Sequence, residues 1–256
     1  YVLEHSFIFE DNTPFRIVEL YNSIEQPVSE YDIPRHTQDC NRLGIPMDPG
    51  NLYAFLAQVR HHYLSKTHHI HLRARTYTMA VVAGESGLRA EELSHLEISK
   101  DLFFESKKLQ TRFAKATMGS GKRSRLTLFP PLSRDTVHYY LKNHRPYIKN
   151  HESNDYLFPS PSGRPVSYSS MQQALKEMVA VTKKSGFPIA DHMSWHWFRR
   201  IFATRFIEQS PNQLPVLISL LGHITPNTVH AYIQHSQAWM DKRMQDVLEK
   251  VDTYGN

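Results

Sequence analysis

The chain has 256 residues, 40% of them hydrophobic, which is enough to bury a substantial core as one large domain or two small ones. It carries 30 Lys plus Arg against 25 Asp plus Glu, and this modest basic balance favours a polyanionic partner only slightly. The single cysteine, Cys40, excludes an internal disulfide framework and a thiolate-rich zinc site. No apolar run approaches the roughly 20 residues that span a membrane, so we expect a protein of the cytoplasm.

Residues 1–50 show no lasting helical period, because five prolines interrupt them. We predict an N-terminal arm or linker here, with one short helix at Pro14–Tyr21. The chain begins at Tyr1 rather than Met, so whether further residues precede Tyr1 is left open.

A helical spacing of apolar residues begins after residue 50, at Leu52, Phe55, Leu56, Val59 and Tyr63. A second helix is predicted over Arg73–Gly84, and a third from about Arg89. Three strands are then predicted, at Leu102–Glu105, Leu109–Phe113 and Arg125–Phe129. The last run alternates, with Leu126 and Leu128 on one face and Thr127 and Phe129 on the other. The intervening segment 114–124, rich in Gly, Lys and Ser, is predicted to be a hairpin loop.

Further helices are predicted at Ser133–Leu141, Ser170–Lys184 and Trp195–Glu208. Ser210-Pro211 and Thr225-Pro226 each combine a capping residue with a proline and predict two more helix starts, while Gly222 would end the first of these helices. The tail Trp239–Val251 has the pattern of a charged amphipathic helix. The sequence therefore predicts a mainly α protein with a small antiparallel β-sheet (α+β), in which residues 51–256 form one domain and residues 237–256 its tail helix.

Two segments carry side chains suited to breaking a phosphodiester without a metal. Arginine binds the non-bridging oxygens of a phosphate bidentately, and Arg89 and Arg199 are candidates for this role. Tyr232 could act as the nucleophile, and His196 as the base or proton donor.

These segments resemble the tyrosine recombinases, the phage integrase family. The family pattern is Gly-Leu-Arg-x-x-Glu-Leu, a lysine on a β-hairpin, His-x-x-Arg, Leu-Gly-His, and a tyrosine nine residues further on. This sequence has Gly87-Leu88-Arg89 followed by Glu92-Leu93, then His196-Trp197-Phe198-Arg199, Leu221-Gly222-His223 and Tyr232. Each motif alone is common, but the full set in this order is specific, and the resemblance covers roughly residues 51–236.

The resemblance implies a role for each matched residue. Arg89 and Arg199 would bind the scissile phosphate, and Tyr232 would attack it to form a 3′-phosphotyrosyl link. His196 would assist proton transfer, and His223 would hydrogen-bond a phosphate oxygen.

Glu92 would brace the site from behind, and the family lysine would protonate the departing 5′-oxygen. Two lysines are candidates for that donor. Lys115 closes the second strand, with Arg125 as the basic residue that follows later in the hairpin, whereas Lys122 follows a glycine inside the loop. We favour Lys115 and keep Lys122 as the alternative.

The resemblance also implies the partners. Double-stranded DNA is the expected substrate, and no cofactor, metal or ATP is expected, because the phosphotyrosine conserves the energy of the broken bond. Family members act as four protomers that exchange a C-terminal helix, a role for residues 237–256. Residues 1–50 would be a reduced arm or the remnant of a DNA-clamping region. Accessory DNA-bending proteins are a further class of partner, and a bacterial or phage source is expected.

Other interpretations remain open. The same chemistry serves type IB topoisomerases and enzymes that resolve hairpin ends, and a related fold could bind DNA without cutting it. Arg89 could be an ordinary surface arginine, His196 a packed core histidine and Tyr232 a half-buried helix residue. The histidine-rich stretch 61–71 could bind a metal, but no carboxylate or cysteine is spaced to complete such a site.

Overall fold

The computed structural model describes residues 47–65, 68–114, 123–222, 242 and 244–245. Within these ranges the chain is mainly helical, with a three-stranded antiparallel sheet in the order β1-β2-β3, which confirms the predicted fold class. The α-helices are α3 (Leu52–Leu64), α4 (Ile70–Ser86), α5 (Ala90–Ser94), α6 (Ile98–Asp101), α7 (Pro131–Asn143), α8 (Tyr168–Lys184), α9 (Trp195–Gln209) and α10 (Leu214–Leu221). The strands are β1 (Leu102–Phe103), β2 (Lys108–Ala114) and β3 (Arg123–Leu128), and short 3₁₀ helices are η2 (Pro49–Asn51), η3 (Arg145–Tyr147) and η4 (His151–Ser153).

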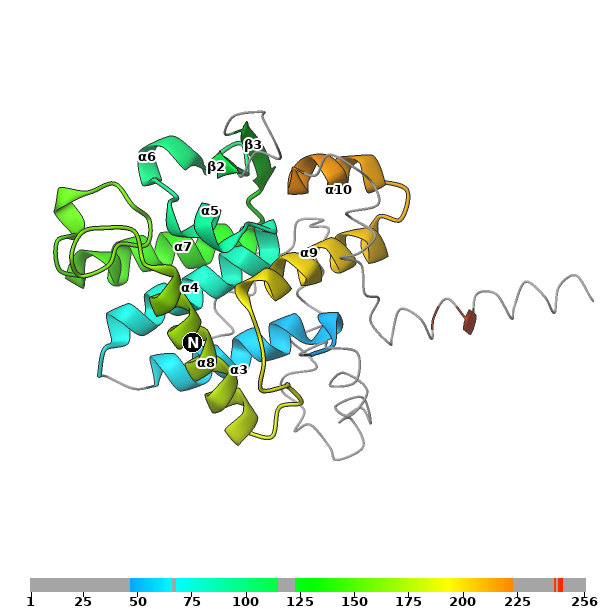
Figure 1. Cartoon of the computed structure of the whole chain (residues 1–256), viewed down its shortest axis with the longest axis horizontal. Coiled ribbons are helices and arrows are strands. Elements are labelled where there is room, and N and C mark those ends of the chain that lie inside the picture. Colours follow the sequence, from blue (N-terminus) through cyan, green and yellow to red (C-terminus); the bar gives the residue numbers. More distant parts are fainter. Residues whose placement is uncertain (1–46, 66–67, 115–122, 223–241, 243, 246–256) are drawn as a thin grey trace, which may run out of the picture.

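Helix α4 lies in the middle of the helical body and packs against α3, α7 and α9 (Figure 1). Twelve of its 17 residues are buried, so it is covered on most sides rather than along one stripe. It extends beyond the predicted Arg73–Gly84 at both ends. Gly84 lies inside the helix and packs closely on α3, since a Cβ there would lie 3.0 Å from Leu52, and Gly87 ends the helix.

Helix α3 buries the apolar face predicted for it, and its last turn ends at Leu64. Tyr63 is the last residue of that face, and its hydroxyl donates to the carbonyl of Ala174 on α8 at 3.3 Å. The spacing of the apolar residues therefore predicted both the helix and its inward side, while the partner helix could not be read from it.

Strand β3 alternates as predicted, and the face that turns inward is the one that carries Thr127 and Phe129. Both residues are buried, whereas Leu126 on the other face is 49% exposed. The hydroxyl of Thr127 donates to the carbonyl of Ser86 at 2.7 Å, so this strand is tied to the end of α4. The sheet therefore sits against the turn that follows α4.

The last described helix, α10, begins at Leu214 and not at the predicted Ser210-Pro211, which precede it outside the helix. The reason is a second proline, Pro215. A proline is tolerated in the first turn of a helix, but Pro215 would fall in the interior of a helix that began at Pro211 and would break its hydrogen-bond ladder. Gly222 ends α10 in the left-handed conformation, as predicted.

A separate apolar cluster holds α10 on α9, made by Phe202, Ala203, Ile207, Leu217 and Leu221. Leu128 of β3 packs against this cluster, and α10 lies at the same end of the molecule as β2 and β3 (Figure 1). The hairpin and the end of α10 are thus brought together over the body of helices.

Several predicted elements lie outside the described residues. They are the arm with its short helix, the helix start at Thr225-Pro226 and nearly all of the tail Trp239–Val251. The domain boundary at residue 51 and the tail helix stay predictions. Within the part of the chain that the structure covers, no helix is long and apolar enough to cross a membrane.

Candidate active site

The turn between α4 and α5 brings Arg89 to the surface. Gly87 ends α4 with φ +64°, and its N–H donates to the carbonyl of Ala83 at 3.1 Å. A Cβ at this position would lie 2.4 Å from a ring carbon of Phe202 on α9. Glycine is therefore needed here both for the backbone conformation and for the close packing of α9 on the turn.

Arg89 precedes α5 and is held by Glu92 through two hydrogen bonds. Its backbone N–H donates to Oε2 at 2.7 Å, and its Nη1 donates to Oε1 at 3.0 Å. The carboxylate is buried, whereas the side chain of Arg89 is 29% exposed. Glu92 thus fixes an arginine whose side chain stays partly exposed.

Glu92 serves a second arginine as well. Nη2 of Arg125, on β3, donates to Oε2 of the same carboxylate at 2.7 Å. Burial lowers the pKa of Arg125, the Glu92 carboxylate opposes this shift, and the Arg89 cation adds to it. An arginine stays charged through such a shift, so two guanidinium groups share one buried carboxylate. The three side chains together carry a net positive charge.

Arg199 is fully buried in the middle of the site. Its Nη1 donates to the carbonyl of Gly87 at 2.8 Å, and its Nη2 donates to the carbonyl of Leu221. A guanidinium has five N–H donors, and these two bonds engage two of them. Arg199 therefore joins the turn that precedes Arg89 to the end of α10.

His196 lies one turn before Arg199 on α9 and is exposed, while its neighbours Trp195 and Trp197 are buried. The exposed position argues against a packed core histidine. Protein atoms still surround enough of the ring to desolvate it, and this lowers the pKa of His196 to about 4, with further lowering by the cations Arg199, Arg200 and Arg89. The imidazole is therefore neutral at pH 7 and able to accept a proton.

Four predicted site residues lie outside the described residues: Lys115, Lys122, His223 and Tyr232. The positions next to them are described. Ala114 at the end of β2 pairs with Arg123 at the start of β3, so both candidate lysines belong to the connection between these strands. Gly222, which ends α10, directly precedes His223.

A buried charged cluster that the sequence analysis missed lies behind the site. The hydroxyl of Tyr53 on α3 donates to Oε1 of Glu85 on α4 at 2.6 Å, and Arg205 on α9 donates to both, at 3.3 Å to the carboxylate and 2.6 Å to the hydroxyl. Burial, reinforced by Glu85, raises the pKa of Tyr53 well above 10, so the hydroxyl keeps its proton. Glu85 and Arg205 have the residue types of an ion pair, but nothing in their spacing indicates that they meet.

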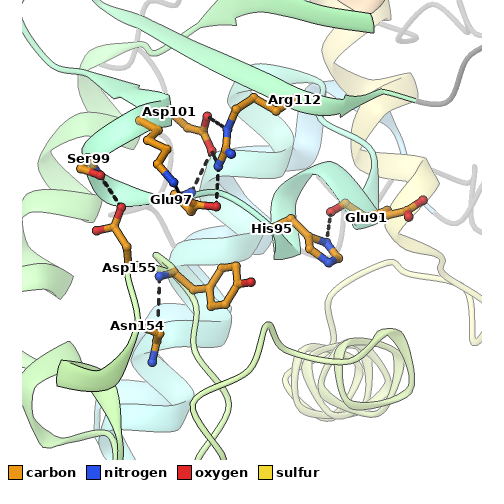
Figure 2. Close-up of polar contacts among 10 residues, drawn as sticks. Glu91, His95, Glu97, Ser99, Asp101, Arg112, Asn154 and Asp155 are labelled. Atoms are coloured by element: carbon orange, nitrogen blue, oxygen red, sulfur yellow. Dashed lines mark hydrogen bonds and ion pairs between the residues drawn. The ribbon is translucent and has the colours of Figure 1, made fainter. Parts of the chain in front are cut away.

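A second network ties β2 to α6 (Figure 2). Arg112 donates two hydrogen bonds, of 2.7 and 2.9 Å, to the buried carboxylate of Asp101 and forms an ion pair with Glu97 at 2.7 Å. The sheet therefore has two arginines anchored on buried acids, and of these Arg125 is the one bonded to Glu92.

The fold and these residues define a mainly helical domain whose cluster of arginines and a neutral histidine suits an anionic phosphate group. A model of the phage integrase family matches residues 56–238, and the chain belongs to that family. It is 26% identical over 173 residues to tyrosine recombinase XerD of Halalkalibacterium halodurans, covering 68% of this chain and 52% of that protein. The chain spans about half the length of the known relatives that it matches.

Solved structures show the same fold. A XerH site-specific recombinase, in a post-cleavage complex with its difH substrate, superposes with a TM-score of 0.59 at 19% identity, over 78% of this chain and 51% of that one. The Tn1549 transposon integrase, in complex with circular intermediate DNA, gives a TM-score of 0.58 at 20% identity, over 79% and 66%.

No group of three or more potential metal ligands occurs among the described residues. In the histidine-rich stretch, His71 contacts His144 at 3.2 Å between their Nδ1 atoms and stacks on Tyr147. Burial, together with the neighbouring His71, lowers the pKa of His144.

Proposed function

We propose that this chain is the catalytic domain of a site-specific DNA recombinase, which cuts and rejoins double-stranded DNA through a 3′-phosphotyrosyl intermediate. The observation that carries the proposal is the convergence of Arg89, His196 and Arg199. Arg89 comes from a part of the sequence distant from His196 and Arg199, which share α9. The surroundings of the three residues leave one arginine accessible, one arginine buried and the histidine neutral. The named recombinases among the relatives support the same function.

In the proposed reaction, Arg89 and Arg199 meet the negative charge of the scissile phosphate as it grows in the transition state. The Oη of Tyr232 bonds to phosphorus, and its proton passes to His196, whose imidazole is neutral at pH 7. His223 donates to a phosphate oxygen. The 5′-oxygen leaves with a proton from Lys115, or from Lys122 in the alternative assignment. Reversal with a second 5′-hydroxyl rejoins the strand.

The partners are proposed on the same basis. Double-stranded DNA is the substrate, four protomers act together on it, and residues 237–256 supply the helix exchanged between them. Residues 1–50 form the arm that precedes the catalytic domain, which begins at residue 51.

The function is tested with nicked duplexes whose sequence is randomised around the nick. Cleavage next to the nick releases a short oligonucleotide, so religation fails and a covalent protein–DNA adduct accumulates. We expect an adduct that survives denaturation in sodium dodecyl sulfate and maps to Tyr232. Tyr232→Phe should bind the selected duplex without forming the adduct, whereas Tyr254→Phe should react normally. Absence of any adduct with the wild-type chain would contradict the proposal.

The selected duplex then separates recombination from simple strand relaxation. Two differently labelled copies of the site should yield joined products that carry both labels. Relaxed circles without joined products would instead indicate a topoisomerase.

A further inference from the structure

Arg125 occupies the inward face of β3 and contacts three separate parts of the site. Its Nη2 donates to Glu92 at 2.7 Å, and its Nη1 donates to the hydroxyl of Thr111 on β2 at 3.3 Å. Its aliphatic part lies against the turn after α10, since a Cβ at Gly222 would lie 2.7 Å from Cδ and 2.9 Å from Nε. One side chain of β3 thus touches α5, β2 and Gly222, the residue before His223.

The burial of Arg125 separates it from the arginines that could meet DNA. Its side chain is 8% exposed, against 29% for Arg89. A backbone phosphate outside the site has little access to such a group. The charge of Arg125 is instead directed at Glu92, whose Oε2 it shares with the backbone N–H of Arg89.

The two oxygens of Glu92 fix Arg89 only while the carboxylate itself cannot rotate. Oε1 accepts from the Arg89 guanidinium, and Oε2 accepts from the Arg89 backbone and from Arg125. The bond from Arg125 is the one that comes from outside the α5 turn. Without this bond, no hydrogen bond from β3 would hold the Glu92 carboxylate, and the carboxylate could rotate together with Arg89.

We propose that Arg125 is a positioning residue: it sets Arg89 through Glu92 and places the hairpin and the Gly222 turn on that same carboxylate. The inference rests on the proposed function, because its effect is measured on the cleavage step. Loss of Arg125 should slow cleavage of bound DNA without weakening binding. A direct phosphate contact would instead weaken binding and flatten its salt dependence.

The experiment uses the selected nicked duplex and compares wild type with Arg125→Gln. At saturating DNA we expect the rate of adduct formation to fall about 10- to 100-fold, the size expected when a reacting group is misplaced by about 1 Å. DNA affinity and its salt slope should match wild type. Arg112→Gln is the matched control, because it removes another arginine of the same sheet, one whose described carboxylate partners are Asp101 and Glu97 in place of Glu92. It should lower the melting temperature at least as much and leave the rate at the wild-type value.

A double-mutant cycle with Glu92→Gln shows whether the effect runs through that carboxylate. In the Glu92→Gln background the added Arg125→Gln change should slow cleavage less than about twofold further, since contacting residues of one network are not additive. Arg125→Lys covers the case in which Arg125→Gln does not fold. Lysine keeps the charge but cannot hold Glu92 and Thr111 together, so its rate should be intermediate.

The outcomes are distinguishable. If wild type forms no adduct, the proposed function fails and this inference fails with it. If wild type cleaves DNA and both Arg125 variants cleave it as fast as wild type does, the inference alone is overturned. Equal slowing in Arg112→Gln, full additivity with Glu92→Gln, or a loss confined to affinity would also overturn it.

Discussion

Arg199 donates a hydrogen bond of 2.8 Å to the carbonyl oxygen of Gly87, across 112 positions of sequence. Gly87 lies two residues before Arg89, so the helix that carries His196 and Arg199 is fixed to the turn that carries Arg89. A buried guanidinium requires hydrogen-bond partners, and here the partner is a backbone carbonyl of the folded domain. The arginines are therefore positioned by the folding of the domain.

Arg89→Ala should lower the rate of cleavage by at least about 10²- to 10³-fold, the usual cost of removing one preorganised donor. Arg89→Lys should rescue little of this, because an ammonium cannot bind a phosphate bidentately. Single-turnover rates on the nicked duplex check both. A lysine variant with nearly the wild-type rate would show that only the charge at this position matters.

Lys115→Ala should be nearly inactive on ordinary DNA and recover on a duplex with sulfur in place of the bridging 5′-oxygen, since a thiolate leaves without a proton. Lys122→Ala should show a smaller defect without that recovery and behave as a phosphate contact. Rates on the two substrates check the assignment. Selective recovery of Lys122→Ala would reverse the two roles.

Gly87→Ala should destabilise the fold more than Gly186→Ala. Both glycines have positive φ, which costs an L residue about 1–2 kcal/mol. A Cβ at Gly186 would meet nothing within 4 Å, whereas one at Gly87 would lie 2.4 Å from Phe202. Urea denaturation of both variants isolates the steric part as their difference. Equal losses would mean that Phe202 moves aside without cost.

His196 should titrate near pH 4, well below its unfolded value of 6.5. Between these values the unfolded chain binds the extra proton, so His196 contributes stability above about pH 6.5 that is lost as the pH falls toward 4. NMR of the imidazole, assigned with His196→Gln, measures the titration. Arg200→Gln should raise the pKa by removing a nearby cation, and an unchanged titration would contradict that contribution.

Arg205→Met should destabilise the domain by about 3–5 kcal/mol, because it leaves the Glu85 carboxylate buried without its cation. The surface pair of Lys183 and Asp191, at 2.5 Å, provides the control. Lys183→Met should cost about 1 kcal/mol or less, since exposed ion pairs contribute little. Chemical denaturation measures both. Similar losses in the two variants would show that the buried cluster is not a special source of stability.

The sequence predicted those parts of the fold that depend on local pattern. The period of α3 and the alternation of β3 are set by which side chains face the core, and both were found. The predicted start of α10 was wrong, because the prediction followed the cap and proline at Ser210-Pro211 and left out Pro215. The position of Pro215 is compatible only with a later start.

The site residues, too, divide into those that local motifs predict and those whose contacts depend on tertiary packing. Arg89, Glu92, His196 and Arg199 were predicted from motifs whose residue types are tied to one chemistry, and their catalytic roles stay predictions. The bond from Arg125 to Glu92 depends on how β3 is placed against α5, which no local pattern encodes. A clue was present, since Arg125 shares the face of Thr127 and Phe129 and an arginine on a buried face needs an acidic partner.

Arg199 donates to two main-chain carbonyls, those of Gly87 and Leu221. Every amino acid supplies such a carbonyl, so no exchange of side chain at either position removes the acceptor. Only a shift of the backbone can do so. The hydrogen bonds between these segments therefore require the arginine side chain at position 199. At positions 87 and 221 they require only the correct backbone conformation.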